Sequence, residues 1–120
     1  MFVTAHRWRD WNGVDPATIA EGAVATTTIG ANPVLLVRVG GKLRAMADVC
    51  PHQGRSLKGG WVDDGHVVCP WHRFHYDPVT GKCKHAMTSS ATVYPVRMLD
   101  ECMQVGFPYR TIRILGFRLW

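Results

Sequence analysis

The stretch that decides the fold is CPHQG at residues 50–54 together with CPWH at residues 69–72. One residue separates Cys50 from His52, two separate Cys69 from His72, and sixteen lie between the two pairs. Each cysteine is followed by proline, which favours a loop over a strand interior. Thiolates and imidazoles together are ligands suited to zinc or to iron–sulfur chemistry. A single C-x-x-H would be a weak signal, but two such pairs indicate a metal centre.

Three interpretations of these residues compete. In the first, the cysteines are ordinary buried side chains, as free cysteines often are; the repeated Cys-Pro step with a nearby histidine argues against chance. In the second, the four residues bind one structural zinc ion, although the ligands of such pairs usually stand two or more residues apart. In the third, two cysteines and two histidines hold the two irons of a [2Fe–2S] centre. We favour the third interpretation.

The sequence outward from the pairs predicts short antiparallel strands. Gly40-Gly41 and Asp100-Glu101 each separate two strand-like runs and predict hairpins. Helix signals are confined to Asp15–Ala20, with Asp15 as N-cap and Pro16 at the first position. The expected fold is all-β, a small antiparallel sandwich or barrel with a cluster-binding subdomain made of two loops. The strands are expected at residues 22–29, 34–39, 42–49, 65–68, 74–76, 93–98, 103–107 and 111–115.

Length and composition limit the classes of protein. The 120 residues predict one domain over residues 1–120, and 47% hydrophobic with 19% charged residues excludes disorder. No run approaches the roughly 20 apolar residues that cross a bilayer, and the N-terminus lacks a secretory signal; we therefore expect a cytoplasmic protein. The net charge of +5 comes from scattered basic residues without a recognition motif, so nucleic acid is not an expected partner.

The two pairs resemble the Rieske iron–sulfur domain, whose motif is C-x-H and C-x-x-H at about this separation. The resemblance extends over roughly residues 34–107 and includes the strand before Cys50, the turn at residues 74–81 and the segment at residues 93–97. It implies a Rieske-type [2Fe–2S] cluster held by loops at about residues 48–77. Cys50 and Cys69 would bind the inner iron, and His52 and His72 the outer iron through Nδ1.

The resemblance also implies a position within the family. High-potential members carry a disulfide between the two loops, and its cysteines would fall at Arg55 and Trp71 here. Their serine that faces a cluster sulfur corresponds to Phe74, which donates no hydrogen bond, although Tyr76 remains. Fewer donors to the sulfurs make reduction less favourable. We therefore expect a potential in the lower part of the family range of about −150 to +300 mV, as in oxygenase-associated members.

Two departures from the family pattern concern the cluster surroundings. The residue after His72 is usually glycine and is Arg73 here, and residues 85–90 replace a loop that often contains proline. Basic and histidine side chains near the loops could form a rim that steers an acidic partner, or could be ordinary surface charge. They are Arg55, Lys58, Arg73, His75 and Lys84; Gln53, Gly54, Trp71, Phe74 and Tyr76 complete the residues expected around the cluster or at the docking surface.

The expected function is that of a one-electron carrier, a Rieske-type ferredoxin between a reductase and a terminal oxygenase of an aromatic or related hydroxylation system. The chain alone is not expected to be an enzyme, because it leaves little room for a mononuclear iron site and a substrate pocket. One alternative is a permanent Rieske subunit or detached Rieske domain of a larger oxygenase or reductase. An alternative of another class is a zinc-stabilised interaction module.

Overall fold

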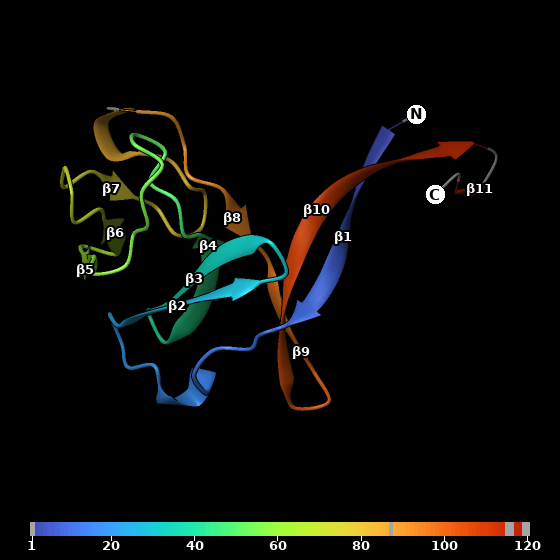
Figure 1. The fold of residues 1–120 in the computed structure, drawn as a ribbon, viewed down its shortest axis with the longest axis horizontal. Coiled ribbons are helices and arrows are strands. Elements are labelled where there is room, and N and C mark those ends of the chain that lie inside the picture. The colour runs from blue at the N-terminus through green and yellow to red at the C-terminus, as the bar shows by residue number, and fades with distance from the viewer. Residues whose placement is uncertain (1, 87, 115–116, 119–120) are drawn as a thin grey trace.

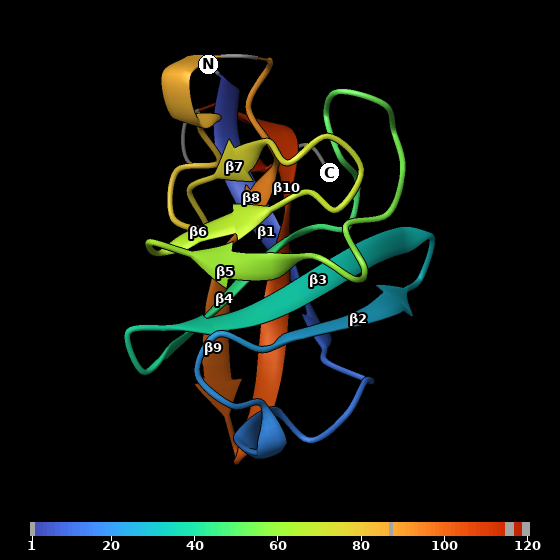
Figure 2. The ribbon, with the colours of Figure 1, turned by 90° about the vertical axis from the view of Figure 1, so that its left-hand side faces the viewer.

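The computed structural model describes residues 2–86, 88–114 and 117–118. Nearly all regular structure is antiparallel sheet, which confirms the expected all-β class. None of the helices in these described residues is long and apolar enough to cross a membrane. Figures 1 and 2 show three sheets arranged along the molecule, with a middle sheet between a lobe of loops and a long two-stranded ribbon.

The middle sheet has the strand order β2-β3-β4-β8. The hairpin at Gly40-Gly41 joins β3 to β4 as expected, with Val39 paired to Lys42 and both glycines at positive φ. Residues 34–37 of β3 are completely buried, because this strand has packed side chains on both of its faces. The strands are β2 (Val24–Ile29), β3 (Asn32–Val39), β4 (Lys42–Ala47) and β8 (Val93–Tyr94).

The ribbon sheet is built on β10, which pairs with β1 and with β9. Figure 1 shows β1 and β10 extending together away from the middle sheet, with the start of β1 and the strand β11 at that extremity. The turn at Asp100-Glu101 joins β9 to β10 as expected. The strands are β1 (Phe2–Asp10), β9 (Val96–Leu99), β10 (Cys102–Ile114) and β11 (Phe117–Arg118).

The loop lobe, residues 48–86 and 88–92, contains the small sheet β5-β6-β7. Its strands are β5 (Trp61–Asp63), β6 (His66–Val68) and β7 (His75–Tyr76), and its one short helix is η2 (Lys84–Ala86). Figure 2 shows this lobe from its outer side, with the long loop that precedes β5 beside the small sheet. A second short helix, η1 (Pro16–Thr18), has the expected Asp15 cap, whose side chain accepts from the Ala17 N–H at 3.0 Å.

Three expectations about strands were wrong. Residues 93–98 form two strands, because Pro95 interrupts the ladder and the chain passes from β4 in the middle sheet to β10 in the ribbon sheet. No new strand begins after Pro108, because β10 continues through this proline. At Pro108, β1 is the only strand paired with β10 among the described residues. Leu115, the last residue of the expected strand, lies outside the described residues. Strands β1 and β5 were not expected at all.

Candidate metal centre

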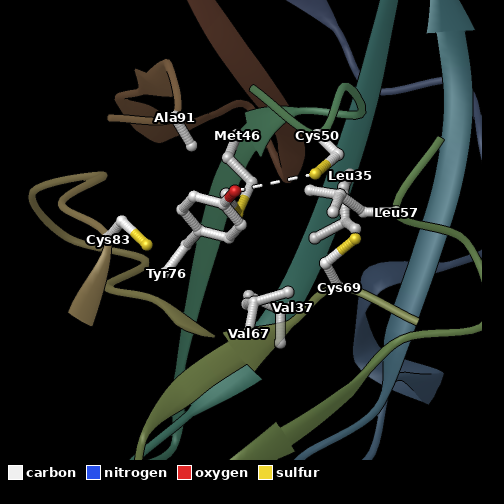
Figure 3. Packing of buried hydrophobic residues seen from close by; sticks show 10 residues of the cluster. All are labelled: Leu35, Val37, Met46, Cys50, Leu57, Val67, Cys69, Tyr76, Cys83 and Ala91. Carbon is white, nitrogen blue, oxygen red and sulfur yellow. Dashed lines mark hydrogen bonds between the residues drawn. The ribbon is translucent and has the colours of Figure 1, made fainter. Parts of the chain in front are cut away.

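Both pair cysteines lie inside the protein. Cys50 and Cys69 have no exposed surface and belong to one apolar cluster with Leu35, Met46 and Tyr76. Figure 3 shows the Tyr76 hydroxyl directed at the Cys50 sulfur, and the two atoms are 3.6 Å apart. The middle sheet and β6 therefore place two thiols together in a site from which water is excluded.

The two loops fold in the same way. The Cys50 N–H donates to the Arg55 carbonyl at 2.7 Å, and the Cys50 carbonyl accepts from the Gly54 N–H at 2.7 Å. At the second loop the Cys69 N–H donates to the Phe74 carbonyl at 2.8 Å, and the Cys69 carbonyl accepts from the Arg73 N–H at 2.9 Å. In both loops the residue four positions after the cysteine has a positive φ, 71° at Gly54 and 57° at Arg73.

Polar groups surround both sulfurs, and the balance between them and burial differs at the two thiols. Burial opposes ionisation of Cys50, but hydrogen bonds from Tyr76, Cys69 and the backbone N–H groups of His52 and Gln53 outweigh it and lower the pKa of this thiol. Burial raises the pKa of Cys69, although its loop also directs backbone N–H groups at the sulfur. A thiolate or a cluster sulfide in this place would receive the same donors.

The two histidines lie on the opposite, outer side of the loops. His52 and His72 are exposed, and their rings stand nearly perpendicular at 85° with centroids 4.6 Å apart. Phe74 packs against both, at 4.9 Å from the His52 ring and 6.2 Å from the His72 ring. The sequence pairs are thus brought together as two buried thiols and two adjacent surface imidazoles.

This donor set fits a dinuclear cluster. In the described part of the chain, no three His, Cys, Asp or Glu side chains meet closely enough to hold one ion. A [2Fe–2S] cluster of mixed ligation asks for only two protein ligands at each iron, which is what the thiol pair and the imidazole pair offer.

Two contacts between the loops were not expected from the sequence. The Arg55 guanidinium lies over the Trp71 ring at 4.7 Å, and the Trp71 Nε1–H donates to the Ser56 carbonyl at 3.0 Å. The buried Asp48 carboxylate accepts from the Ser56 hydroxyl at 2.6 Å and from the Leu57 N–H at 2.7 Å. Asp48 precedes Cys50 by two residues, and that position in the motif is the only signal that could have indicated it.

The structure places the other residues expected near the centre in different surroundings. Gln53 and Gly54 are exposed on the first loop, while Tyr76 is fully buried beneath the thiols. Arg73, Phe74, His75 and Lys84 line one hollow beside the imidazoles, together with His85. Lys58 lines a different hollow, near β2 and Trp61. Arg73 and Lys84 thus lie together, while Lys58 lies at another hollow.

The chain matches the Rieske [2Fe-2S] domain over residues 11–99. It is 36% identical over 104 residues to the anthranilate 1,2-dioxygenase ferredoxin subunit of Burkholderia cepacia, covering 86% of this chain and 94% of that protein. It is 30% identical over 81 residues to the ferredoxin component of the naphthalene 1,2-dioxygenase system of Pseudomonas putida, covering 67% and 78%.

Solved structures agree with this match. A chain of the complex of reduced oxygenase and oxidized ferredoxin in carbazole 1,9a-dioxygenase superposes with a TM-score of 0.69 at 25% identity, covering 82% of this chain and 91% of that one. Sequence, fold and donor set agree, and the chain belongs to the Rieske [2Fe-2S] domain family, with the Rieske-type [2Fe–2S] cluster as its cofactor.

Proposed function

We propose that this Rieske-type ferredoxin carries single electrons from a reductase to the terminal oxygenase of a system that hydroxylates an aromatic or related small molecule. The observation that carries the proposal is the arrangement of the two pairs: thiols in the core and imidazoles 4.6 Å apart at the surface. Such an arrangement gives an electron a short exit to a partner. Two relatives that the chain nearly spans are ferredoxin components of dioxygenase systems.

We assign the ligands residue by residue. Cys50 and Cys69 would bind the inner iron, and His52 and His72 the outer iron through Nδ1. The burial of both thiols and the exposure of both imidazoles support this division. The bound cluster supplies a site that accepts and releases one electron. Around it, the loops exclude water from the sulfurs and direct Tyr76 and backbone N–H groups at them.

We further propose that residues 1–120 act as one domain, with residues 48–77 binding the cluster. The middle sheet supports this, because one face of β3 packs on the cysteines and the other packs toward the ribbon sheet. A cytoplasmic location is supported by the four cysteines, none of which is paired in a disulfide.

The first experiment is metal and sulfide analysis of freshly purified protein, with EPR after dithionite reduction. The proposal expects about two irons and two sulfides per chain and a low average g value, which mixed histidine and cysteine ligation produces. Replacing Cys50, Cys69, His52 or His72 by alanine should abolish the native signal, while Cys102→Ala should keep it. One zinc per chain, without a signal after anaerobic reconstitution, would refute the carrier function.

The partners are tested in a second experiment. The purified chain, a ferredoxin reductase and an oxygenase of a naphthalene-type system are mixed with NADH and an aromatic substrate. We expect product formation to depend on this chain. If product formed at the same rate without this chain, the chain would not carry electrons between the reductase and the oxygenase.

A further inference from the structure

Arg73 occupies a backbone position that suits glycine. The two loops share their hydrogen bonds, and the equivalent residue is Gly54 in the first and Arg73 in the second. A side chain with φ near +57° is strained relative to glycine, because its Cβ approaches the following carbonyl oxygen. The protein therefore holds an arginine where a smaller residue would fit the loop better.

A second strained residue lies beside Arg73. Five described non-glycine residues have a positive φ, and three of them, Asp64, Asp100 and Glu101, lie in hairpin turns that require it. The other two are Arg73 and His85, at φ 57° and 62°. Both line the same hollow of about 300 Å³. Backbone strain outside turns gathers at functional sites, so this coincidence points to the hollow.

The hollow is basic and has no acidic lining residue. Its walls are Arg73, Phe74, His75, Lys84 and His85. The nearest acidic contact is Asp64, which is 3.9 Å from the Lys84 ammonium and itself largely exposed. The Nδ1 atom of His75 is shielded from solvent and has no hydrogen-bond partner among the described residues. A carboxylate would find the positive charges of Arg73 and Lys84 and the imidazole nitrogens of His75 and His85 here.

The hollow also shares a residue with the imidazole pair. Phe74 forms one of its walls and at the same time packs against the rings of His52 and His72. A group bound in the hollow would therefore lie next to the imidazole pair. The other basic residues of the loops are placed differently, since Arg55 covers the Trp71 ring and Lys58 lines another hollow.

We propose that the hollow formed by Arg73, Phe74, His75, Lys84 and His85 is a socket for a carboxylate side chain of an acidic redox partner, and that it seats this partner against His52 and His72. The socket rests on the proposed electron-carrier function and specifies the docking chemistry of that site. The partner is identified by charge complementarity, because neither loop, residues 50–60 or 69–76, contains an acidic residue.

The test uses the reduced, cluster-containing protein and two small oxidants of opposite charge. Ferricyanide, an anion, and tris(phenanthroline)cobalt(III), a cation, each take one electron from the protein and become ferrocyanide and the cobalt(II) complex. A change in driving force moves both rates in the same direction. A change in charge at the electron exit moves them in opposite directions, which separates the two effects.

Arg73→Gln should slow oxidation by ferricyanide about three- to tenfold at low ionic strength and accelerate oxidation by the cobalt complex. Both differences should vanish at about 0.5 M salt, where the Debye length falls to a few ångströms. Lys84→Gln should act in the same direction. Lys58→Gln is the matched control, since it removes one positive charge from the first loop outside the socket. If the oxidation rates changed equally in the Arg73→Gln and Lys58→Gln variants, the proposed socket would be wrong.

The strained backbone gives a second readout. Arg73→Gly should raise the apparent melting temperature by roughly 4 °C, because glycine relieves the strain, and should slow ferricyanide oxidation as Arg73→Gln does. If Arg73 had only a structural role, the Arg73→Gly variant would be less stable than the wild type and its oxidation rates would be unchanged.

Octaglutamate should inhibit ferricyanide oxidation of the wild-type protein more than inorganic phosphate at the same ionic strength. Equal or stronger inhibition by phosphate would make the hollow a free-anion site and refute docking.

These outcomes are distinct from a failure of the carrier function. A protein that dithionite does not reduce would give no electron to either oxidant, and both proposals would fall. A protein that reacts with both oxidants, but with no dependence on Arg73 or Lys84, would keep its carrier function and lose only the socket.

Discussion

The hydroxyl of Tyr76 is directed at the Cys50 sulfur in the candidate metal centre. Its oxygen lies 3.6 Å from the Cys50 sulfur, and burial raises the pKa of Tyr76 far above its usual value, so it stays a donor at every working pH. A donor to a ligand sulfur favours the reduced, more negative centre. We expect Tyr76→Phe to lower the reduction potential by roughly 40 mV, the equivalent of about 1 kcal/mol for one electron.

The potential is measured by a spectroscopic redox titration. Tyr94→Phe is the control, because Tyr94 packs in the other core cluster, beside Phe107 with ring centroids 4.8 Å apart. Its potential should equal that of the wild type. An unchanged or raised potential in Tyr76→Phe would show that the hydroxyl does not donate to the centre.

The family resemblance implies that Arg55 and Trp71 correspond to the two cysteines of the disulfide that high-potential members carry. The structure fills these positions with a stacked pair at 4.7 Å, and the Trp71 indole donates to Ser56. We expect this non-covalent contact to hold the loops together by about 1–2 kcal/mol. Trp71→Leu should therefore accelerate cluster loss to an iron chelator about five- to twentyfold.

Arg55→Gln should accelerate cluster loss less, because the indole hydrogen bond remains. The visible absorbance reports the loss, and Lys58→Gln serves as the control on the same loop. If Trp71→Leu lost its cluster at the wild-type rate, the two loops would be held by other contacts.

The candidate site could be predicted at its Cys/His pairs and not around them. Spacing along the chain singled out Cys50, His52, Cys69 and His72 as candidate ligands, because each pair is local, and the fold brings the two pairs together. The Asp48–Ser56 contact and the Arg55–Trp71 stack join residues eight and sixteen positions apart through a loop shape that no pattern encodes. The residues of the proposed socket could not be predicted either. Lys84 and His85 lie near Arg73 because the chain turns back after β7.

At the scale of elements, prediction succeeded where strands contain buried apolar runs and a recognisable turn joins them. β3 and β4 contain apolar runs, and a Gly-Gly turn joins them, so the hairpin was visible in the sequence. The sequence pattern did not predict β1, because its described side chains at residues 4–10 are mostly exposed. This strand is held by its pairing with β10 in the ribbon sheet rather than by packing in the core. The split between β8 and β9 was missed because Pro95 interrupts a run whose pattern looks continuous.

The turn after β7 depends on a close approach of two backbones. A Cβ at Gly81 would lie 2.0 Å from the Ala91 carbonyl oxygen, and φ at Gly81 is 79°. Gly65 offers a matched control: its φ is 74°, but a Cβ at this position would meet no other atom within 4 Å. We expect Gly65→Ala to lower the free energy of unfolding by about 1 kcal/mol and Gly81→Ala by about 3 kcal/mol or more.

Chemical unfolding followed by circular dichroism measures both glycine variants. The difference between them isolates the contact with Ala91, because both substitutions carry the same cost of positive φ. Equal losses of stability would mean that the segment before β8 moves away from Gly81 without penalty.

At the scale of the whole molecule, the middle sheet separates two cores. One contains both cysteines, Tyr76 and the underside of the loop lobe, and the other joins the middle sheet to the ribbon sheet. Consecutive residues of β3 serve different cores, since Leu35 belongs to the first and Leu36 to the second. Successive side chains of a strand point to opposite faces, so one strand supports the redox site and the scaffold together.

Leu35→Ala and Leu36→Ala therefore form a matched pair of substitutions. Both side chains are completely buried, so each variant should lose about 2–5 kcal/mol of unfolding free energy. Only Leu35→Ala opens a cavity in the core that holds the thiols, and we expect it alone to accelerate cluster loss and broaden the EPR signal under conditions where both variants remain folded. Cluster loss timed against an iron chelator, with circular dichroism as the check on folding, measures this. Equal acceleration in the two variants would show that the middle sheet transmits disorder between the cores, and the separation of site from scaffold would be wrong.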